Sequence, residues 1–295
     1  MYAKVNGYRL FFDVEGLQYV AEGAVMRERP VCLVMHGGPG ADHTHYLPDL
    51  SPLAQYCQLI YIDDRNCGLS DHIDYTTNTV KQNVEDIEAL REYLGLDKVF
   101  ILGHSYGGMK AQYYAAHHPE HLYGAIIVAT VPNAETFSIE RIERNILRFG
   151  SQELADLHHA YTNGESELTL SELMLKILPL YHGKGKFKEE YIENEKHVTF
   201  NTELNRYQDD HELRVPEKYN LIPDLKKVDL PCLVIAGDQD FICDLEANQE
   251  IAAAIPGCEF HVLKGTSHEV FMDDPEIVFP LITDFMERNY NVGDR

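Results

Sequence analysis

The sequence predicts an α/β protein in which a mostly parallel, doubly wound sheet carries an inserted helical cap. Three observations lead to this fold class. Short, continuous apolar runs recur along the chain, as in strands that are buried on both faces. Helix-like segments separate these runs, so that strands and helices alternate. The alternation stops over residues 131–222 and then resumes.

The expected strands lie in the two outer parts of the chain. Residues 1–15 alternate apolar and polar positions around Asn6-Gly7, which is a hairpin signal. Six apolar runs after them are interpreted as buried strands, at residues 31–35, 59–62, 99–102, 125–129, 232–236 and 259–263. Because the carboxyl ends of parallel strands meet at one edge of a sheet, we expect functional residues directly after these runs.

The expected helices lie between the strands and in the interruption. Residues 80–94 place apolar side chains at three- and four-residue steps, and residues 109–118 and 277–286 are the next helical segments. The interruption contains charged helical patterns at 139–149 and 171–178, followed by the Gly/Lys-rich segment 182–186. We therefore expect two units: a core domain formed by residues 1–130 and 223–295, and a helical cap subdomain formed by residues 131–222.

Composition excludes several partners. The net charge of −23 repels phosphate backbones, so nucleic acid is not an expected partner. The charge serves either solubility or a local acidic patch that attracts the cationic end of a substrate. No run of about 18 apolar residues or signal peptide is found, so no membrane partner and a cytoplasmic location are expected. The six cysteines form no CxxC pair and are interpreted as reduced thiols.

A short motif marks a candidate nucleophile. Gly103-His104-Ser105-Tyr106-Gly107 matches G-x-S-x-G, and it stands between an apolar run and a helical segment. In this context the motif forms a turn so tight that large flanking side chains are excluded, which exposes the serine hydroxyl. The alternative is an ordinary strand–helix loop, which becomes less favoured once partner residues are counted. We predict Ser105 as the nucleophile.

A serine hydroxyl needs a base at neutral pH, and the end of the chain supplies one. His268 follows the last expected strand, and Asp238 and Asp240 follow the strand before it. The order serine, acid, histidine is the one that accompanies this motif. We prefer Asp240 as the acid because it lies further past its strand, whereas Asp238 is suited to capping or orienting the loop. The alternative for His268, one of 15 histidines, is a surface loop role.

Backbone N–H groups for a developing oxyanion are expected from two places. The segment His36-Gly37-Gly38-Pro39-Gly40 follows a strand and is nearly free of side chains, and the N–H of Tyr106 begins the helix after the serine. Removing one such donor typically costs about 3–4 kcal/mol of transition-state stabilisation. A phosphate-binding loop is the alternative for the glycine-rich segment, but the Gly-Lys-Ser/Thr ending of such loops is absent.

Three segments together resemble the proline iminopeptidase family of α/β-hydrolases. They are HGGPG at 36–40, DDRNCGLS at 63–70 and GHSYGG at 103–108, and HGGPG is the most specific of them. The resemblance implies the α/β-hydrolase fold, no metal or cofactor, and removal of an N-terminal residue, often proline, from short peptides or amides. It also implies a set of site residues: Gly38 and Tyr106 as oxyanion donors, and Ser105, Asp240 and His268 as the triad.

The sequence departs from that family in two places. The usual D-Q-R-G-x-G-x-S has Asn66 where glycine is expected, and asparagine tolerates left-handed backbone angles. The expected cap has no G-P-x-E-F motif, and the chain has no tryptophan. Candidates for contacting the substrate and its free amine are Gly37, Glu203, Asp209, Asp210 and Glu212. The alternative for the acidic run is a solvated helix face.

Three functions therefore compete. The first is an aminopeptidase-like hydrolase of short peptides, aminoacyl amides or esters. The second is a carboxylesterase, lactonase or amidase for small uncharged acyl substrates, which the same nucleophile and oxyanion loop would serve. The third is a catalytically silent receptor or binding module, because fold alone does not give function; the complete set of catalytic candidates argues against it. The expected partner is a small-molecule or short-peptide substrate, and the exposed cap surface is compatible with a homo-oligomer.

Overall fold

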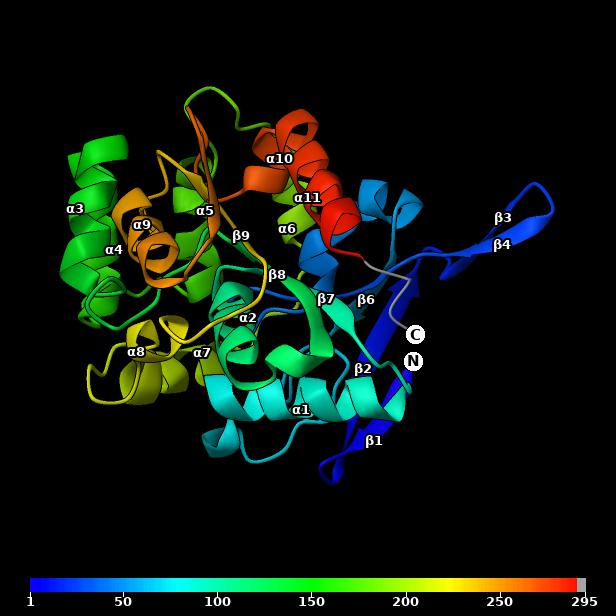
Figure 1. The fold of residues 1–295 in the computed structure, drawn as a ribbon. Coiled ribbons are helices and arrows are strands. Elements are labelled where there is room, and N and C mark those ends of the chain that lie inside the picture. Colours follow the sequence, from blue (N-terminus) through cyan, green and yellow to red (C-terminus); the bar gives the residue numbers. More distant parts are fainter. Residues whose placement is uncertain (291–295) are drawn as a thin grey trace.

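The computed structural model describes residues 1–290 and places an eight-stranded sheet between two layers of helices (Figure 1). The sheet order is β1-β2-β6-β5-β7-β8-β9-β10. Pairings among β5 to β10 are parallel, and β1 and β2 join in an antiparallel manner. The bounds are β1 (Tyr2–Val5), β2 (Tyr8–Glu15), β5 (Val31–Met35), β6 (Gln58–Ile62), β7 (Val99–His104), β8 (Leu122–Val128), β9 (Cys232–Gly237) and β10 (Glu259–Leu263). The predicted α/β-hydrolase fold with a mostly parallel sheet is confirmed.

The central strands are apolar throughout because helices cover both of their faces. Every residue of β5, β7 and β9 is buried. Successive residues of one strand belong to different cores: in β7, Ile101 packs on one side of the sheet, and Phe100 and Leu102 pack on the other. The two cores hold the helices in place on the two faces.

The two layers of helices are fixed by their apolar faces and their caps. One layer contains α1 (Val80–Tyr93), α2 (Tyr106–His117) and α9 (Leu245–Ala254), and the other contains α10 (Val270–Asp273) and α11 (Pro275–Asn289). Thr79 and Asp244 begin α1 and α9 by accepting hydrogen bonds from backbone N–H groups of the first turn. Among the helices of residues 1–290, none combines the length and apolarity needed to cross a bilayer.

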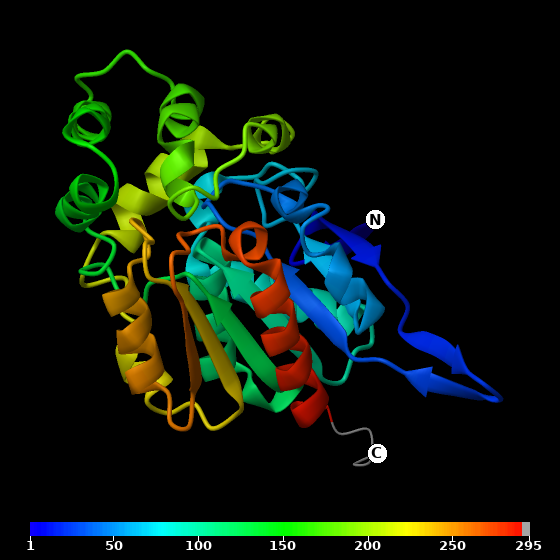
Figure 2. The same ribbon diagram turned by 90° about the horizontal axis from the view of Figure 1, so that it is seen from above.

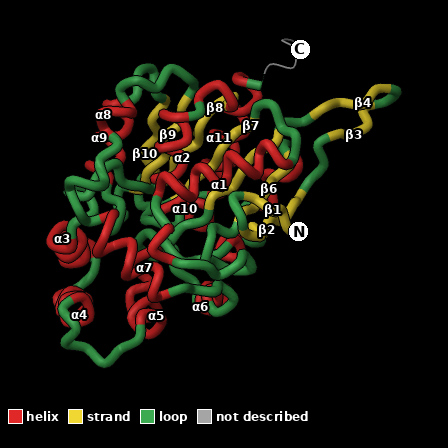
Figure 3. The backbone as a smooth tube through the Cα atoms, turned by 90° about the horizontal axis from the view of Figure 1, so that it is seen from below, coloured by secondary structure: helices red, strands yellow, loops and turns green. Residues whose placement is uncertain are grey.

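Five helices that the structure describes between β8 and β9 gather above one end of the sheet, as Figures 2 and 3 show. They are α3 (Ile139–Phe149), α4 (Gln152–Thr162), α5 (Leu170–Tyr181), α6 (Glu190–Glu195) and α7 (Thr202–Gln208). The last helix before β9, α8 (Ile222–Leu225), packs beside α2 and α9. A π-helical turn, Asp209–Leu213, continues α7. A backbone bridge between Asn133 and Asn220 joins the start and the end of the insertion. We propose that these two residues mark the neck of the cap, close to the expected boundaries at 131 and 222.

One element was not expected from the sequence. β3 (Tyr19–Glu22) and β4 (Val25–Glu28) form a separate antiparallel hairpin that projects from the body of the molecule (Figure 1). These strands are short and largely exposed, so they lack the continuous apolar signal of the buried strands.

Candidate active site

The turn between β7 and α2 holds Ser105 in an unusual backbone conformation. Its φ of 57° and ψ of −122° lie outside the regions that residues with side chains commonly adopt. Two glycines permit the turn: a Cβ on Gly103 would lie 2.1 Å from the carbonyl oxygen of Gly107, and a Cβ on Gly107 would lie 1.9 Å from that of Met35. This is the geometry expected of the G-x-S-x-G turn, which presents its serine at the strand–helix junction.

The loops after β9 and β10 bring an aspartate and a histidine into contact. Asp240 Oδ2 lies 2.7 Å from His268 Nδ1. The second oxygen of Asp240 accepts hydrogen bonds from the backbone N–H groups of Ile242 and Cys243, both at 2.9 Å, so the carboxylate is held in place. Asp238 instead accepts a hydrogen bond from the N–H of the loop before His268, at Gly265, over 2.7 Å. The structure therefore brings Asp240, and not Asp238, to the histidine.

The Asp240 carboxylate also sets the protonation of His268. Burial alone would lower the pKa of His268, but the charge of Asp240 and its hydrogen bond outweigh burial and raise that pKa above the ordinary 6.5. Because the carboxylate accepts from Nδ1, the neutral ring carries its proton there and leaves Nε2 free. A ring in this state can act as a general base.

Two contacts place Ser105 beside this pair. The ring of His104, the preceding residue, has its Nε2 2.9 Å from the backbone oxygen of His268, and the two rings lie 4.6 Å apart. On the other side, the thiol of Cys243 contacts the Ser105 hydroxyl. The Cys243 sulfur also lies within 4.8 Å of an Asp240 oxygen and of a His268 ring nitrogen. The three loops thus converge, and Ser105 and His268 line one cavity.

The glycine-rich loop after β5 lies against the serine. A Cβ on Gly37 would be 3.4 Å from the Cβ of Ser105, and Gly38 has a φ of 112°, which glycine adopts far more readily than other residues. His36 fixes the loop, because its Nε2 accepts from the N–H of Asp64 at 3.1 Å and its Nδ1 donates to the carbonyl of Gly37 at 2.7 Å. Burial lowers the pKa of His36, which favours the neutral ring that this bonding requires.

The second expected oxyanion donor lies at the start of α2, and hydrogen bonds from two other helices hold this part of the chain. The buried hydroxyl of Tyr106 accepts hydrogen bonds from Asn83 Nδ2 at 2.9 Å and from Gln208 Nε2 at 2.6 Å. Asn83 belongs to α1, whereas Gln208 is the last residue of α7 in the insertion. The ammonium group of Lys110, which is paired with the buried Asp64, lies 5.0 Å from the centre of the Tyr106 ring.

The Gly/Lys-rich segment between α5 and α6 docks on the loop that carries the histidine. His182 Nδ1 lies 3.0 Å from Asp273, and Lys186 Nζ lies 2.6 Å from Asp274. Both acceptors stand at the C-terminal end of α10, the short helix that follows His268, where α11 begins. The segment that interrupts the helical pattern of the sequence is therefore a contact between the insertion and the site.

The cavity in front of Ser105 is large enough for a short peptide or an acyl chain. Its volume is about 690 Å³, within the usual range for sites that bind small molecules. The core supplies the catalytic loops, and the helices of the insertion supply most of the apolar lining: Phe137, Ile142, Leu173, Met174, Ile177 and Leu178. Gly37 also lines the cavity, as expected.

Of the four expected cap carboxylates, the structure brings Asp209 and Asp210 to the cavity. Asp209 is buried at the start of the π-helical turn, and its Oδ2 lies 3.1 Å from Arg214. Its Oδ1 has no hydrogen-bond partner within the described part of the chain. Burial raises the pKa of Asp209 to about 6, and Arg214 opposes that shift.

The other two expected carboxylates, Glu203 and Glu212, are not among the residues that line the cavity. Glu203 is exposed on α7. Glu212 turns toward α1, where its Oε1 accepts a hydrogen bond from the N–H of Val80 at 3.0 Å, and burial raises the pKa of its carboxyl to about 7. It therefore satisfies the first turn of α1 and does not line the cavity of Ser105.

Three cavity or site residues were missed by sequence reasoning. Glu269 is buried, lines the cavity and lies 3.4 Å from Nε2 of His45, which also lines it. Burial would raise the pKa of Glu269, but His45 and the neighbouring histidines lower it below its usual range. Cys243 contacts Ser105. Adjacency to His268 and the three-residue spacing from Asp240 are signals that could have found Glu269 and Cys243, whereas His45 carries none.

Some of these side chains have the chemistry of metal ligands. In the described chain, three groups of donor atoms lie within 4.8 Å of one another: His45, His104 and Glu269; Asp240, Cys243 and His268; and Glu88, His118 and His121. In the first group, both ring nitrogens of His104 are engaged by protein oxygens, and in the second, Asp240 and His268 bond each other. Acyl transfer at a serine requires only the imidazole and the amide donors described above.

Comparison with known proteins gives a family and a set of relatives. The family model for the alpha/beta hydrolase fold matches residues 30–275. The proline iminopeptidase PfmaB of Pestalotiopsis fici is 27% identical over 286 residues, which cover 94% of this chain and 99% of the relative. A proline iminopeptidase structure from Mycobacterium smegmatis has a TM-score of 0.76 at 20% identity and 98% coverage of both chains. Est816, described as an N-acyl homoserine lactone degrading enzyme, has a TM-score of 0.72 at 20% identity, with 97% of this chain and 100% of that chain covered.

Proposed function

The chain belongs to the alpha/beta hydrolase fold family, and from this premise we propose that it is a serine hydrolase that removes the N-terminal residue from short peptides or aminoacyl amides. One observation carries the proposal. Ser105, the Asp240–His268 pair and the glycine-rich loop converge on a cavity that also contains Asp209, a buried carboxylate with an unpartnered oxygen. The first three serve acyl transfer, and the carboxylate suits the free amine of a peptide.

In the proposed mechanism, His268 Nε2 takes the proton of the Ser105 hydroxyl as the serine oxygen attacks the substrate carbonyl carbon. The N–H groups of Gly38 and Tyr106 stabilise the oxyanion of the tetrahedral intermediate. The imidazolium, held by Asp240, then gives its proton to the leaving amine, and an acyl-enzyme forms. Water repeats the sequence, with His268 as base again, and releases the N-terminal residue as a free acid.

The amine of the substrate is assigned to Asp209. An α-ammonium group lies two bonds from the carbonyl that Ser105 attacks, so its partner must line the same cavity. Asp209 meets this requirement, and its pKa of about 6 leaves it mostly ionised at neutral pH. Oδ1 is closed to solvent in this structure, so an ammonium must displace a neighbouring side chain to reach it; there it would satisfy a buried acceptor and lower that pKa. The relatives named proline iminopeptidase, such as that of Pestalotiopsis fici, support a substrate with a free N-terminal amine but do not bear on the choice of Asp209.

The second candidate is an esterase or lactonase for small acyl substrates. It is favoured by the apolar lining from α5, including Leu173, Met174 and Ile177, which needs no charged partner. The likeness to Est816 extends over 97% of this chain, but at 20% identity it shows the fold alone. The two candidates share the nucleophile and differ in whether a free amine is recognised.

A comparison of three substrate types tests the proposal: free-amine prolyl and alanyl arylamides, the same arylamides with the amine acetylated, and short-chain aryl esters. We expect turnover of the free-amine arylamides and loss of turnover on acetylation. Ser105→Ala serves as the control for background hydrolysis. Equal rates on free and blocked arylamides would contradict amine recognition, and esters cleaved far faster than any arylamide would favour the second candidate.

A further inference from the structure

A cluster of histidine and glutamate side chains lies at the edge of the sheet that is remote from Ser105. Its members come from α1 and from residues 118–121, which join the end of α2 to the start of β8. Ser105 follows the carboxyl end of β7, whereas His121 precedes the amino end of β8. Because β7 and β8 run parallel, these two positions lie at opposite edges of the sheet. The cluster therefore takes no part in the proposed acyl transfer.

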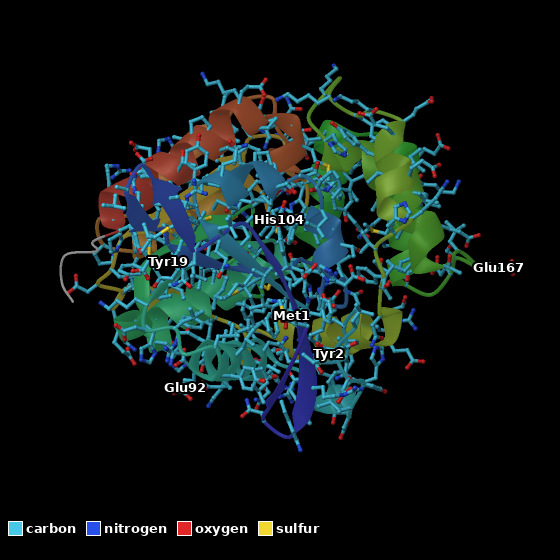
Figure 4. All side chains as sticks on the ribbon, turned by 90° about the vertical axis from the view of Figure 1, so that its right-hand side faces the viewer. Met1, Tyr2, Tyr19, Glu92, His104 and Glu167 are labelled. Atoms are coloured by element: carbon cyan, nitrogen blue, oxygen red, sulfur yellow. The ribbon has the colours of Figure 1, made fainter. Side chains whose placement is uncertain are left out.

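The figures show the same separation between the cluster and the cavity. α1 and α2 lie side by side on one face of the sheet (Figure 1). Figure 4 shows Glu92, near the end of α1, and Glu167 of the insertion at opposite sides of the molecule. A ligand bound between α1 and the α2–β8 connection would thus be held by groups that neither line the cavity nor belong to the insertion.

Metal-ligating atoms of the cluster converge between these elements. One oxygen of Glu88 and one ring nitrogen each of His118 and His121 lie within 4.8 Å of one another. Glu88 Oε1 lies 3.0 Å from His121 Nδ1. His118 Nε2 lies 3.4 Å from Oε1 of Glu85, which precedes Glu88 by one turn of α1. Two imidazole rings and two carboxylates therefore meet in one place.

The two ring nitrogens that face the carboxylates lack hydrogen bonds. His118 Nε2 and His121 Nδ1 are closed to solvent, and neither has a hydrogen-bond partner among the described residues. The neighbouring carboxylate oxygens are near each nitrogen but outside hydrogen-bond geometry. Buried polar atoms left in this state are uncommon and costly. A cation held by the nitrogen lone pairs and the carboxylates would satisfy both rings.

Glu88 is held in one orientation by its other contacts. Arg91 Nε donates to Glu88 Oε2 at 2.9 Å, and the hydroxyl of Tyr114 donates to the same oxygen. Arg91 Nη2 donates to Oε1 at 2.6 Å, and that oxygen keeps a second lone pair for a metal. Hydrogen bonds of this kind orient the carboxylate ligands of metal sites. Because Glu85 adds a second carboxylate, the charge of Arg91 does not cancel the attraction for a cation.

We propose that Glu88, His118 and His121, with Glu85 as a fourth ligand, bind a zinc ion that joins α1 to the connection between α2 and β8. Imidazole nitrogen together with carboxylate oxygen suits Zn²⁺, whereas Mg²⁺ and Ca²⁺ prefer oxygen alone. Tetrahedral bonds of about 2.0–2.2 Å place donors about 3.3–3.6 Å apart, close to the observed separations of 3.0 and 3.4 Å. The remaining separations, within 4.8 Å, shorten by side-chain rotation when the ion is bound.

Zinc titration of the untagged, chelator-treated protein tests the proposal, with calorimetry and a competing chromophoric chelator as readouts and Mg²⁺ as the comparison ion. We expect a micromolar or tighter dissociation constant for Zn²⁺ and no measurable binding of Mg²⁺. His118→Gln and His121→Gln should each weaken one zinc site by more than the roughly 10–100-fold that loss of an outer partner costs. His117→Gln is the matched control, because the His117 ring stacks on Tyr113 and its Nε2 lies 3.7 Å from Asp224.

A second measurement needs no variant. Anomalous scattering from wild-type crystals soaked in Zn²⁺ should place an ion between Glu88, His118 and His121, and labelling of Ser105 by a fluorophosphonate should continue while that site is filled. No ion at this position in zinc-saturated crystals would overturn the proposal. Equal zinc affinities of the wild type and all three variants would also overturn it, and would leave the two histidines as ion-pair partners of the glutamates.

Discussion

Two aspartates that stand two residues apart illustrate how the site depends on individual contacts. Asp240 meets His268 through one oxygen and two backbone N–H groups through the other, so the carboxylate has one fixed orientation. Asp238 instead accepts a hydrogen bond from the N–H of Gly265, and this bond holds the loop before the histidine. The same side chain therefore contacts the proposed base at one position and holds a loop at the other.

Substitution of the two aspartates separates these roles. Asp240→Asn is expected to lower kcat/KM by about 10³–10⁴, because the amide no longer favours the required tautomer or stabilises the imidazolium. Asp238→Asn keeps a side-chain oxygen that accepts from Gly265, so a change of less than about tenfold is expected. Steady-state kinetics of both variants, with circular dichroism as a folding control, provide the check. The assignment of the acid is wrong if Asp238→Asn is the more damaging change.

The pH dependence of the reaction should follow His268. The pKa of His268 is raised above 6.5 by Asp240, and a protonated ring cannot accept the serine proton. Activity is therefore present above that pKa and is lost as pH falls through it, with a midpoint above 6.5. Asp209 has a pKa of about 6, so it becomes protonated as pH falls and the proposed binding of the substrate amine weakens as well. A kcat/KM profile on an amine-blocked aryl ester isolates the histidine, and a midpoint below 6.5 would contradict this reading.

At the scale of the element, the elbow between β7 and α2 depends on the absence of side chains. A Cβ at Gly107 would collide with a backbone oxygen of β5, and backbone cannot yield as a flexible side chain would. The strand that carries the glycine-rich loop and the helix that carries Ser105 are thereby packed backbone to backbone. This closeness is what places Gly37 against the serine.

Gly107→Ala is expected to push α2 away from β5. The strain should destabilise the protein by about 1–3 kcal/mol and abolish labelling of Ser105 by a fluorophosphonate. Gly164→Ala is the control, because Gly164 faces open space and has only the strain of its positive φ, about 1 kcal/mol. Urea unfolding and active-site labelling measure the two effects. Full labelling of Gly107→Ala would show that the elbow tolerates a wider turn.

Elements differ in how far the sequence predicts them. The buried strands were predictable because continuous apolar runs such as 99–102 have few alternative environments. The left-handed backbone expected for Asn66 is also observed, with a φ of 63°. The β3–β4 hairpin was not predicted, because its strands are short and exposed. The hydrogen bond of Glu212 to α1 was also not predictable from the sequence, because it depends on the π-helical turn and on the residue at which α1 begins. The triad itself stays a prediction that the geometry supports.

At the scale of the whole molecule, the insertion and the core are joined by buried polar contacts. Arg141 of α3 binds both oxygens of Asp244, each at 2.6 Å, and Asn145 adds a third hydrogen bond to the same carboxylate. Asp244 also caps α9 through the N–H of Ala247. One core residue thus anchors a helix of the insertion above the catalytic loops.

Asp244→Ala is expected to lower the free energy of unfolding by about 2–4 kcal/mol, because it removes a helix cap and leaves the guanidinium of Arg141 with only the longer, exposed contact to Glu246. Asp284→Ala, which breaks the exposed pair of Asp284 with Arg288, is the control and should change stability by less than about 0.5 kcal/mol. Urea denaturation measures both. Similar small losses in the two variants would mean that the insertion is anchored elsewhere.

The hydrogen bond from Gln208 to the hydroxyl of Tyr106 links the position of α7 in the insertion to the start of α2 in the core. Any outward movement of α7 that widens the entrance must first release this bond, and Tyr106 is the residue whose own N–H is proposed to receive the oxyanion. The insertion therefore cannot move away from the core at α7 without removing one of the two hydrogen bonds that hold the Tyr106 hydroxyl.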